Sequence, residues 1–127
     1  MPGPNQNEEP SMKYILLIYS DPAAEAQLSE AQMQAIYQAH EAYGQALEAA
    51  GVMRGGAELK PPATATTLRF AGGRSTLVDG PYAETKEQLG GYYLIETETL
   101  DEALAWAAKM PGMEAGAVEV RPLGMGA

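Results

Sequence analysis

Residues 78–95 read VDGPYAETKEQLGGYYLI, a stretch that joins the strongest turn signal of the chain to the start of a strand. Gly80 tolerates any φ, whereas Pro81 fixes its own φ and keeps the preceding residue out of the helical region, so this pair predicts a sharp turn. Residues 83–88 then predict a single charged helical turn, and residues 89–97 predict a strand. The glycine pair at 90–91 predicts a bulge or a close backbone approach in that strand.

Hydrophobic periodicity and capping signals predict the elements on either side of this stretch. The continuous apolar run at residues 13–19 predicts a central strand covered on both faces. Capping-box patterns followed by closing glycines predict helices within residues 29–51 and 99–112. Glycine-rich residues 71–74 predict a hairpin turn. The remaining predicted strands are residues 52–59, 64–70, 75–78 and 117–123.

This order of elements predicts an α+β fold, a ferredoxin-like βαββαβ plan with an extra hairpin segment. Right-handed crossovers place both helices on one face of the sheet. Since the strands lack polar alternation, we expect the other face to pack on a second copy, giving a homodimer through the sheet face. Residues 1–11 have nothing to bury and predict a disordered tail, which leaves residues 12–127 as a single domain.

Composition narrows the classes of function. The formal charge of −9, from 8 basic and 17 acidic side chains, disfavours binding to nucleic acid or to an anionic membrane surface. The absence of cysteine excludes disulfides and thiol catalysis and, with no signal peptide in view, predicts a cytoplasmic protein. One histidine and no clustered acids predict no metal site, and no phosphate loop or dinucleotide fingerprint occurs, so no cofactor is expected.

The run DGPYAETKEQLGGYYLIE at residues 79–96 resembles the signature of the DGPF branch of the YCII-related superfamily, with Tyr82 where phenylalanine is usual. The resemblance extends from Lys13 to Leu123. It implies a bacterial protein and a dimeric α+β barrel, and it implies no particular reaction. Members of this branch are often encoded beside, or fused to, extracytoplasmic-function sigma factors, so the resemblance also allows a functional link to a sigma factor.

His40 is the candidate catalytic residue, because it is the chain's single histidine and histidine alone has an unperturbed pKa near neutrality. Its spacing to Gly51 resembles that of a histidine in the wider superfamily, proposed there to act with an aspartate at the end of the second helix. Met110 occupies that position here, so the dyad is incomplete unless Asp79 replaces the missing carboxylate. The alternative is a structural His40 packed among apolar side chains.

Candidate ligand-binding residues lie in or near the signature stretch and the strands. Asp79 either closes its turn by accepting backbone amides or lines a pocket rim. Lys86 either anchors an anionic ligand or belongs to a solvated charged face. The phenols either contact a ligand or lie in the core or a dimer interface, and Arg54 pairs either with a ligand carboxylate or with an acid of the chain. The set is Tyr19, Arg54, Asp79, Tyr82, Lys86 and Tyr92.

These observations leave three functions open. The first is a homodimeric small-molecule-binding or regulatory module, which the absence of a convincing catalytic set favours. The alternative is a small cofactor-free enzyme that uses His40, with Asp79, for acid–base chemistry. The third is a purely structural dimer, which predicts no pocket.

Overall fold

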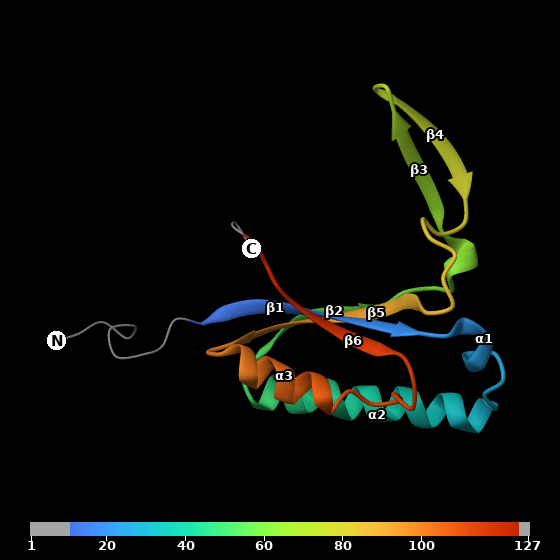
Figure 1. Ribbon diagram of the computed structural model, residues 1–127. Helices are drawn as coiled ribbons and strands as arrows, with labels where there is room; N and C mark the ends of the chain where they lie inside the picture. The colour runs from blue at the N-terminus through green and yellow to red at the C-terminus, as the bar shows by residue number, and fades with distance from the viewer. Residues whose placement is uncertain (1–10, 125–127) are drawn as a thin grey trace.

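The structure of the protein, a computed structural model, describes residues 11–124 (Figure 1). Its elements are β1 (Met12–Ser20), α1 (Pro22–Glu25), α2 (Glu30–Ala49), β2 (Met53–Glu58), the 3-10 turn η1 (Pro62–Thr64), β3 (Thr66–Ala71), β4 (Arg74–Asp79), β5 (Gln88–Thr97), α3 (Leu100–Ala108) and β6 (Ala117–Pro122). Within the described residues the strands form a four-stranded antiparallel sheet, ordered β2-β5-β1-β6, and a separate two-stranded hairpin of β3 and β4. This arrangement confirms the predicted ferredoxin-like plan with an extra hairpin.

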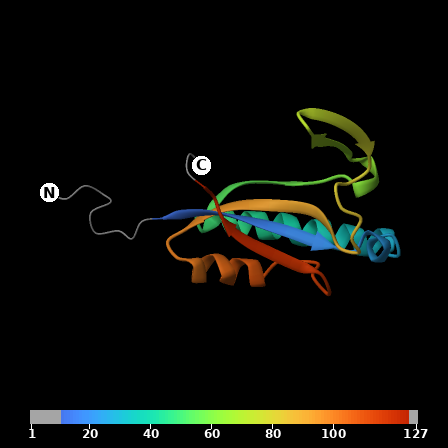
Figure 2. The same cartoon turned by 45° about the horizontal axis from the view of Figure 1, so that its top comes forward.

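Capping begins both long helices where the sequence predicts. The Ser29 hydroxyl accepts a hydrogen bond from the Gln32 amide at 3.1 Å, and the Gln32 side chain accepts one from the Ser29 amide at 2.8 Å. The Thr99 hydroxyl accepts the Glu102 amide at 3.2 Å at the start of α3. These bonds satisfy amides that the first helical turn leaves without partners. Both helices lie on the same side of the sheet (Figures 1 and 2).

The core lies between the sheet and these helices. Leu16 of β1, Leu47 of α2 and Ile95 of β5 are fully buried there, and full burial of one such side chain stabilises the fold by about 1.5–3 kcal/mol. Met110, at the position where the family resemblance implies an aspartate, is also buried in this core.

The opposite side of the sheet carries an apolar surface that we call the open face. It consists of Ile15, Leu17 and Tyr19 from β1 and Tyr92 and Leu94 from β5, all half-buried. The two strands are paired so that Leu17 faces Tyr92 and Ile15 faces Leu94. The two long helices, α2 and α3, lie on the other side of the sheet (Figure 1). The central position of β1 is confirmed by its pairing with β5 and β6, and within one chain only one of its faces is covered by helices.

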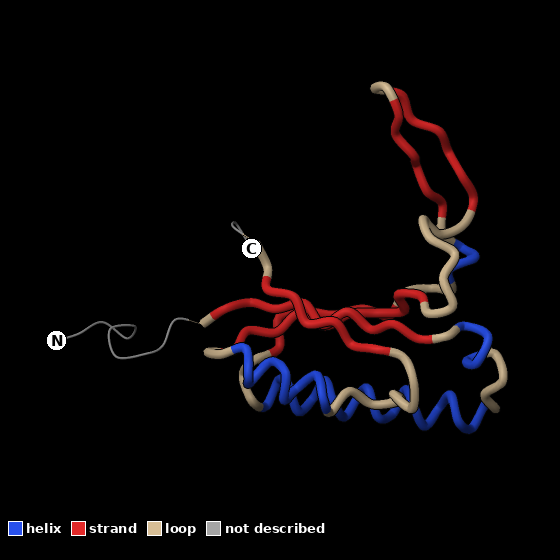
Figure 3. The backbone as a smooth tube through the Cα atoms, in the orientation of Figure 1, coloured by secondary structure: helices blue, strands red, loops and turns tan. Residues whose placement is uncertain are grey.

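The hairpin of β3 and β4, residues 66–79, stands away from the sheet on the side opposite the helices (Figures 1 and 3), and we call it the arm. Its predicted glycine turn is confirmed: Gly72 and Gly73 have φ of +58° and +78°, the positive values that tight hairpin turns require. Its root is fixed by a hydrogen bond from the Gly80 amide to the Ala65 carbonyl at 2.7 Å, with Gly80 at φ +105°.

The helical turn predicted for residues 83–88 is wrong, since this segment forms bends and no helix. The Gln88 side-chain amide donates to the carbonyls of Ala83 at 2.8 Å and Thr85 at 2.9 Å, so a side chain satisfies backbone groups that helical amides would otherwise satisfy. A segment this short cannot offset the cost of nucleating a helix without such help. We call residues 82–87 the signature loop.

Two segments flank β1. The tail predicted for residues 1–11 lies outside the described residues except for Ser11, whose hydroxyl donates a hydrogen bond to the Glu96 carboxylate. After β1, the short helix α1 begins at Pro22, and the Asp21 carboxylate accepts the Ala23 amide at 3.0 Å. No helix was predicted at α1, although an aspartate followed by proline is a typical helix start.

Candidate functional site

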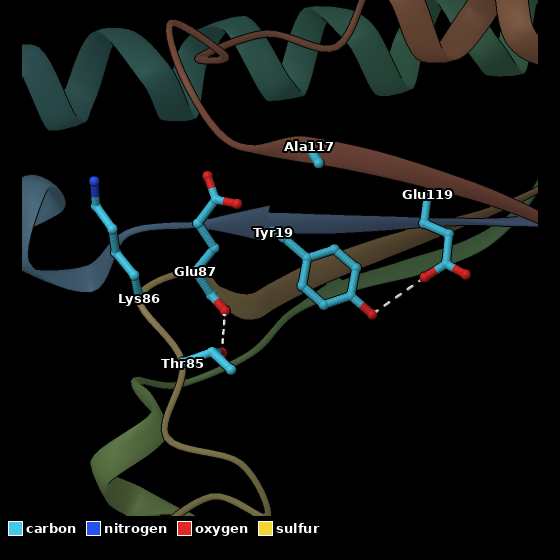
Figure 4. Close-up of a pocket in the computed structure, with 6 residues that line it drawn as sticks. All are labelled: Tyr19, Thr85, Lys86, Glu87, Ala117 and Glu119. Carbon is cyan, nitrogen blue, oxygen red and sulfur yellow. Dashed lines mark hydrogen bonds between the residues drawn. The ribbon is translucent and has the colours of Figure 1, made fainter.

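An open depression of about 680 Å³ lies at the end of the open face (Figure 4). Its walls come from three parts of the chain: Tyr19 at the end of β1, the start of β6, and the signature loop. The Tyr19 hydroxyl points toward Glu119 and donates to its carboxylate at 3.4 Å. The Thr85 hydroxyl donates to the Glu87 carbonyl at 2.6 Å, a hydrogen bond within the signature loop. The lining residues are Tyr19, Thr85, Lys86, Glu87, Ala117 and Glu119.

Two glycines let the backbone take the shape that this depression needs. The pairing of β1 with β5 jumps from Ile18–Gly91 to Tyr19–Leu89, so Gly90 is an extra residue and the predicted bulge is confirmed. Directly before β6, Gly116 has φ +97°, and a Cβ there would lie 2.3 Å from the Tyr19 carbonyl oxygen. Only glycine can therefore bring β6 this close to Tyr19.

The depression carries charges of both signs. Lys86 supplies a cation, and Glu87 and Glu119 supply anions. Glu119 also accepts from the Arg121 guanidinium, with Nε at 3.1 Å. Such a rim can bind a small polar molecule that has both an anionic group and a hydrogen-bond donor, because each would meet its complement there.

A second groove of about 550 Å³ lies at the root of the arm and contains Asp79. Its lining includes Gln88 and prolines 22, 61, 62 and 81. Within residues 11–124 the Asp79 carboxylate accepts no hydrogen bond. The turn after it is closed by the backbone bond between Gly80 and Ala65, so the sequence alternative in which Asp79 caps its own turn does not hold here.

His40 lies on the helix side of the sheet, half-buried, and its partner is Tyr93. Nδ1 of His40 is 2.8 Å from the Tyr93 hydroxyl, and the rings stack with centroids 6.0 Å apart and an interplanar angle of 10°. Burial lowers the pKa of His40 below its usual value, and the Glu58 carboxylate opposes this shift. His40 is therefore the neutral imidazole near pH 7, and its tautomer decides whether Nδ1 accepts a hydrogen bond from the Tyr93 hydroxyl or donates one to it.

The His40–Tyr93 pair belongs to an aromatic row between α2 and α3. Tyr43 meets Tyr93 edge to face at 5.1 Å and donates its hydroxyl to the Trp106 carbonyl at 2.7 Å. Burial raises the pKa of Tyr43 to about 12, so it remains protonated. The row joins the two helices to the sheet. His40 and Asp79 are not brought together, because His40 lies beneath the sheet and Asp79 at the root of the arm above it (Figure 1).

The other predicted ligand residues are spread over the molecule. Arg54 lies 3.1 Å from the Glu96 carboxylate and also donates to the Gly51 carbonyl at 3.0 Å, so it joins the end of α2 to β5. Tyr82 is 73% exposed. The guanidinium carbon of Arg69 lies over the Tyr82 ring, 5.0 Å from the ring centre. Tyr92 lies on the open face. Tyr19 and Lys86 are thus the two predicted residues that share one depression.

Sequence reasoning missed several members of these groups. Glu119 belongs to the alternating strand at residues 117–122, and its place in that pattern puts it on the same side as Leu17, which it faces. The partner of His40 carried no local signal, since Tyr93 is 53 residues away.

Clusters of His, Cys, Asp or Glu that could hold a metal ion are absent from residues 11–124. No helix in this part of the chain is long and apolar enough to cross a bilayer.

The fold defines an α+β protein of the ferredoxin-like class, and comparison with known proteins identifies its family. The family model of the YCII-related domain matches residues 12–124, so the chain belongs to the YCII-related family. A protein of Rhizobium meliloti (strain 1021), named only as uncharacterized, is 37% identical over 116 residues, covering 90% of this chain and 94% of the relative. Neither match carries an established reaction, which agrees with the expectation from the signature stretch.

Proposed function

We propose that the protein is a homodimeric binding module for a small organic molecule, in which a second copy covers the open face and the depression beside Tyr19 holds the ligand. The observation that carries this proposal is that Tyr19 and Lys86 line one depression at the end of an apolar sheet face. A pocket of this kind favours binding over a purely structural dimer.

The dimer part of the proposal is supported by the open face. Ile15, Leu17 and Leu94 place half-buried aliphatic side chains on a sheet surface that α2 and α3 do not cover. A contiguous apolar surface of this kind is a typical interaction site, and a two-fold axis lets the same surface cover itself. The partner would then enclose the depression, which is widely open in one chain.

The chemistry of the lining supports a small organic acid with a hydroxyl or aromatic group as the ligand. Lys86 would contact the carboxylate as a mobile cation. Tyr19 would donate its hydroxyl or contact the apolar part of the ligand, and Glu119 would accept a ligand hydroxyl. The proposal places the protein in the cytoplasm, which the lack of cysteine favours, and it allows a regulatory role beside a sigma factor.

The alternative is a cofactor-free enzyme in which His40 transfers a proton. The observation that favours it is the half-buried His40 with a lowered pKa, paired with the Tyr93 hydroxyl at 2.8 Å. Tyr93 would orient the imidazole in place of the carboxylate, with Asp79 acting separately at the arm root. The separation of His40 from Asp79 and from the depression makes this the second candidate.

A thermal-shift screen of small organic acids and phenols tests the proposal. A ligand that binds only the folded state and is present at a concentration of about 100 times its Kd adds about 2.7 kcal/mol to the free energy of unfolding, which raises Tm measurably. We expect at least one compound to raise the Tm of the wild type and of Lys109→Met, a matched loss of charge on the helix side, and to have a much smaller effect on Lys86→Met.

His40→Ala separates the two candidates in the same screen. The binding proposal expects its ligand shift to equal that of the wild type, because His40 lies apart from the depression. Equal shifts for Lys86→Met and Lys109→Met would contradict the binding site. A shift lost only in His40→Ala would favour the enzyme and would make turnover of that compound the next assay.

A further inference from the structure

We propose that the arm of each subunit packs against a second copy of this chain, so that the two arms clasp the dimer. This inference rests on the proposed homodimer and adds a second contact surface to it. The arm is residues 66–79, and its apolar side faces solvent within one chain.

The register of the hairpin separates its side chains into two faces. Residues directly opposite one another on paired strands point to the same side. Leu68 pairs with Leu77 and Phe70 pairs with Ser75, so these four side chains share one face of the arm. The other face carries Arg69, which pairs with Thr76. The apolar side chains are therefore concentrated on one face, although Val78 lies on the other face, paired with Thr67.

The apolar face of the arm is more exposed to solvent than is expected for a stable isolated hairpin. Phe70 is 75% exposed, Leu77 is 64% exposed and Leu68 is 54% exposed. Two strands alone are at best marginally stable in water, and they need a partner surface on one face. Because the arm stands away from its own sheet and helices (Figures 1 and 2), that surface must come from another molecule.

The placement of the arm identifies the other molecule as a second copy. The arm projects on the same side of the sheet as the open face (Figure 1), so a copy seated on the open face lies beside the arm. The charge fits as well. The arm carries Arg69 and Arg74, and its one acidic residue is Asp79 at the root, so the arm is net positive in a chain whose net charge is −9. Two chains of net negative charge repel each other, whereas the basic arm of one chain attracts the acidic body of the other chain.

The root of the arm favours intermolecular contact over folding back. Pro61, Pro62 and Pro81 restrict the backbone where the arm leaves the body. The Gly80 amide donates to the Ala65 carbonyl at 2.7 Å, and the Thr67 hydroxyl donates to the Gly80 carbonyl at 2.8 Å. A fixed root holds the arm extended before association, which reduces the entropy lost on binding.

Clasping would also affect the ligand depression. The chain passes from the arm root directly into the signature loop, whose residues Thr85 and Lys86 form one wall of the depression. A partner that holds the arm therefore holds the segment that positions Lys86.

Single cysteines test the clasp, because the natural chain has none. Ser75→Cys places a thiol on the apolar face while leaving Phe70 intact, and Thr76→Cys places a control thiol on the other face of the same strand. We expect the dimer to protect Cys at 75 from a water-soluble thiol reagent, with a reaction several-fold slower than at 76. The difference should vanish when Leu17→Asp in the open face dissociates the dimer.

The outcomes separate the clasp from the dimer. Equal reactivity of the two thiols in a dimeric protein would overturn the clasp and leave the sheet-face dimer standing. A wild type that is monomeric at every concentration would overturn both. As a second readout, Phe70→Ser should weaken dimerisation about tenfold or more, whereas Thr76→Ala should leave it unchanged. Equal dimer Kd values for these two variants would also overturn the clasp.

Discussion

The hydrogen bond between His40 and Tyr93 provides the sharpest prediction from the interior of the protein. Tyr93→Phe removes only the hydroxyl that lies 2.8 Å from Nδ1 of His40. The ring remains, so its stacking on His40 and its edge contact with Tyr43 are retained. Any loss of stability in this variant therefore measures the hydrogen bond.

The expected magnitude follows from the burial of the two groups. A net hydrogen bond contributes about 0.5–1.5 kcal/mol, and a half-buried imidazole nitrogen left without its partner adds part of a desolvation cost. We expect Tyr93→Phe to lower the free energy of unfolding by about 1–2 kcal/mol. In a domain of this size that corresponds to a decrease in Tm of roughly 3–8 °C.

Urea unfolding followed by the fluorescence of Trp106, the single tryptophan, is the assay. All variants should be compared at one protein concentration, because dimerisation makes stability depend on it. Tyr82→Phe is the matched control, since that hydroxyl is exposed and makes no hydrogen bond within the described residues; we expect a change within about 0.5 kcal/mol. Equal stability of Tyr93→Phe and Tyr82→Phe would refute the reasoning.

Three further predictions concern backbone, charge and capping. Gly116→Ala should destabilise the fold by more than about 2 kcal/mol in urea unfolding, since φ is +97° and the new Cβ lies 2.3 Å from a carbonyl oxygen. Gly44→Ala, in a helix with open space around it, should instead stabilise the fold by about 0.5–1 kcal/mol. A change of the same sign in both variants would contradict this prediction. Because burial lowers the pKa of His40, the unfolded state binds a proton that the folded state does not bind. The free energy of unfolding should therefore rise with pH from the lowered pKa up to about pH 6.5, and fall as the pH is lowered through the same window. His40→Gln should flatten this part of the profile of stability against pH, and an unchanged slope would contradict the prediction. Ser29→Ala should cost about 1 kcal/mol by removing the cap of α2, measured by far-UV circular dichroism during unfolding, and no loss would show that the cap is dispensable.

Much of the fold could be predicted because its signals are local. Capping at Ser29 requires only a serine and a glutamine three residues apart, and the Gly72-Gly73 turn requires only two residues that accept positive φ. The bulge at Gly90 followed from a glycine pair in a strand. In each case the physical cause lies within a few residues of the effect.

The error in the signature loop arises from a side-chain contact that composition does not reveal, and the omissions arise where distant residues decide the outcome. The signature loop has the composition of a short helix, but Gln88 and the turn at Pro81 hold it in bends. His40 was recognised as the one titratable group near neutrality, but its pairing with Tyr93 depends on how α2 crosses the sheet. Glu119 reaches Tyr19 only because β6 pairs beside β1.

The mass of the protein in solution, measured by analytical ultracentrifugation on the full chain, tests the proposed binding dimer most directly. We expect the wild type to sediment with twice the mass of one chain. Leu17→Asp, in the middle of the open face, should sediment as a folded monomer, while Leu104→Asp on the exposed side of α3 should remain a dimer. A wild type that is monomeric at every concentration would contradict the proposal, as would a Leu17→Asp variant that dimerises as tightly as Leu104→Asp.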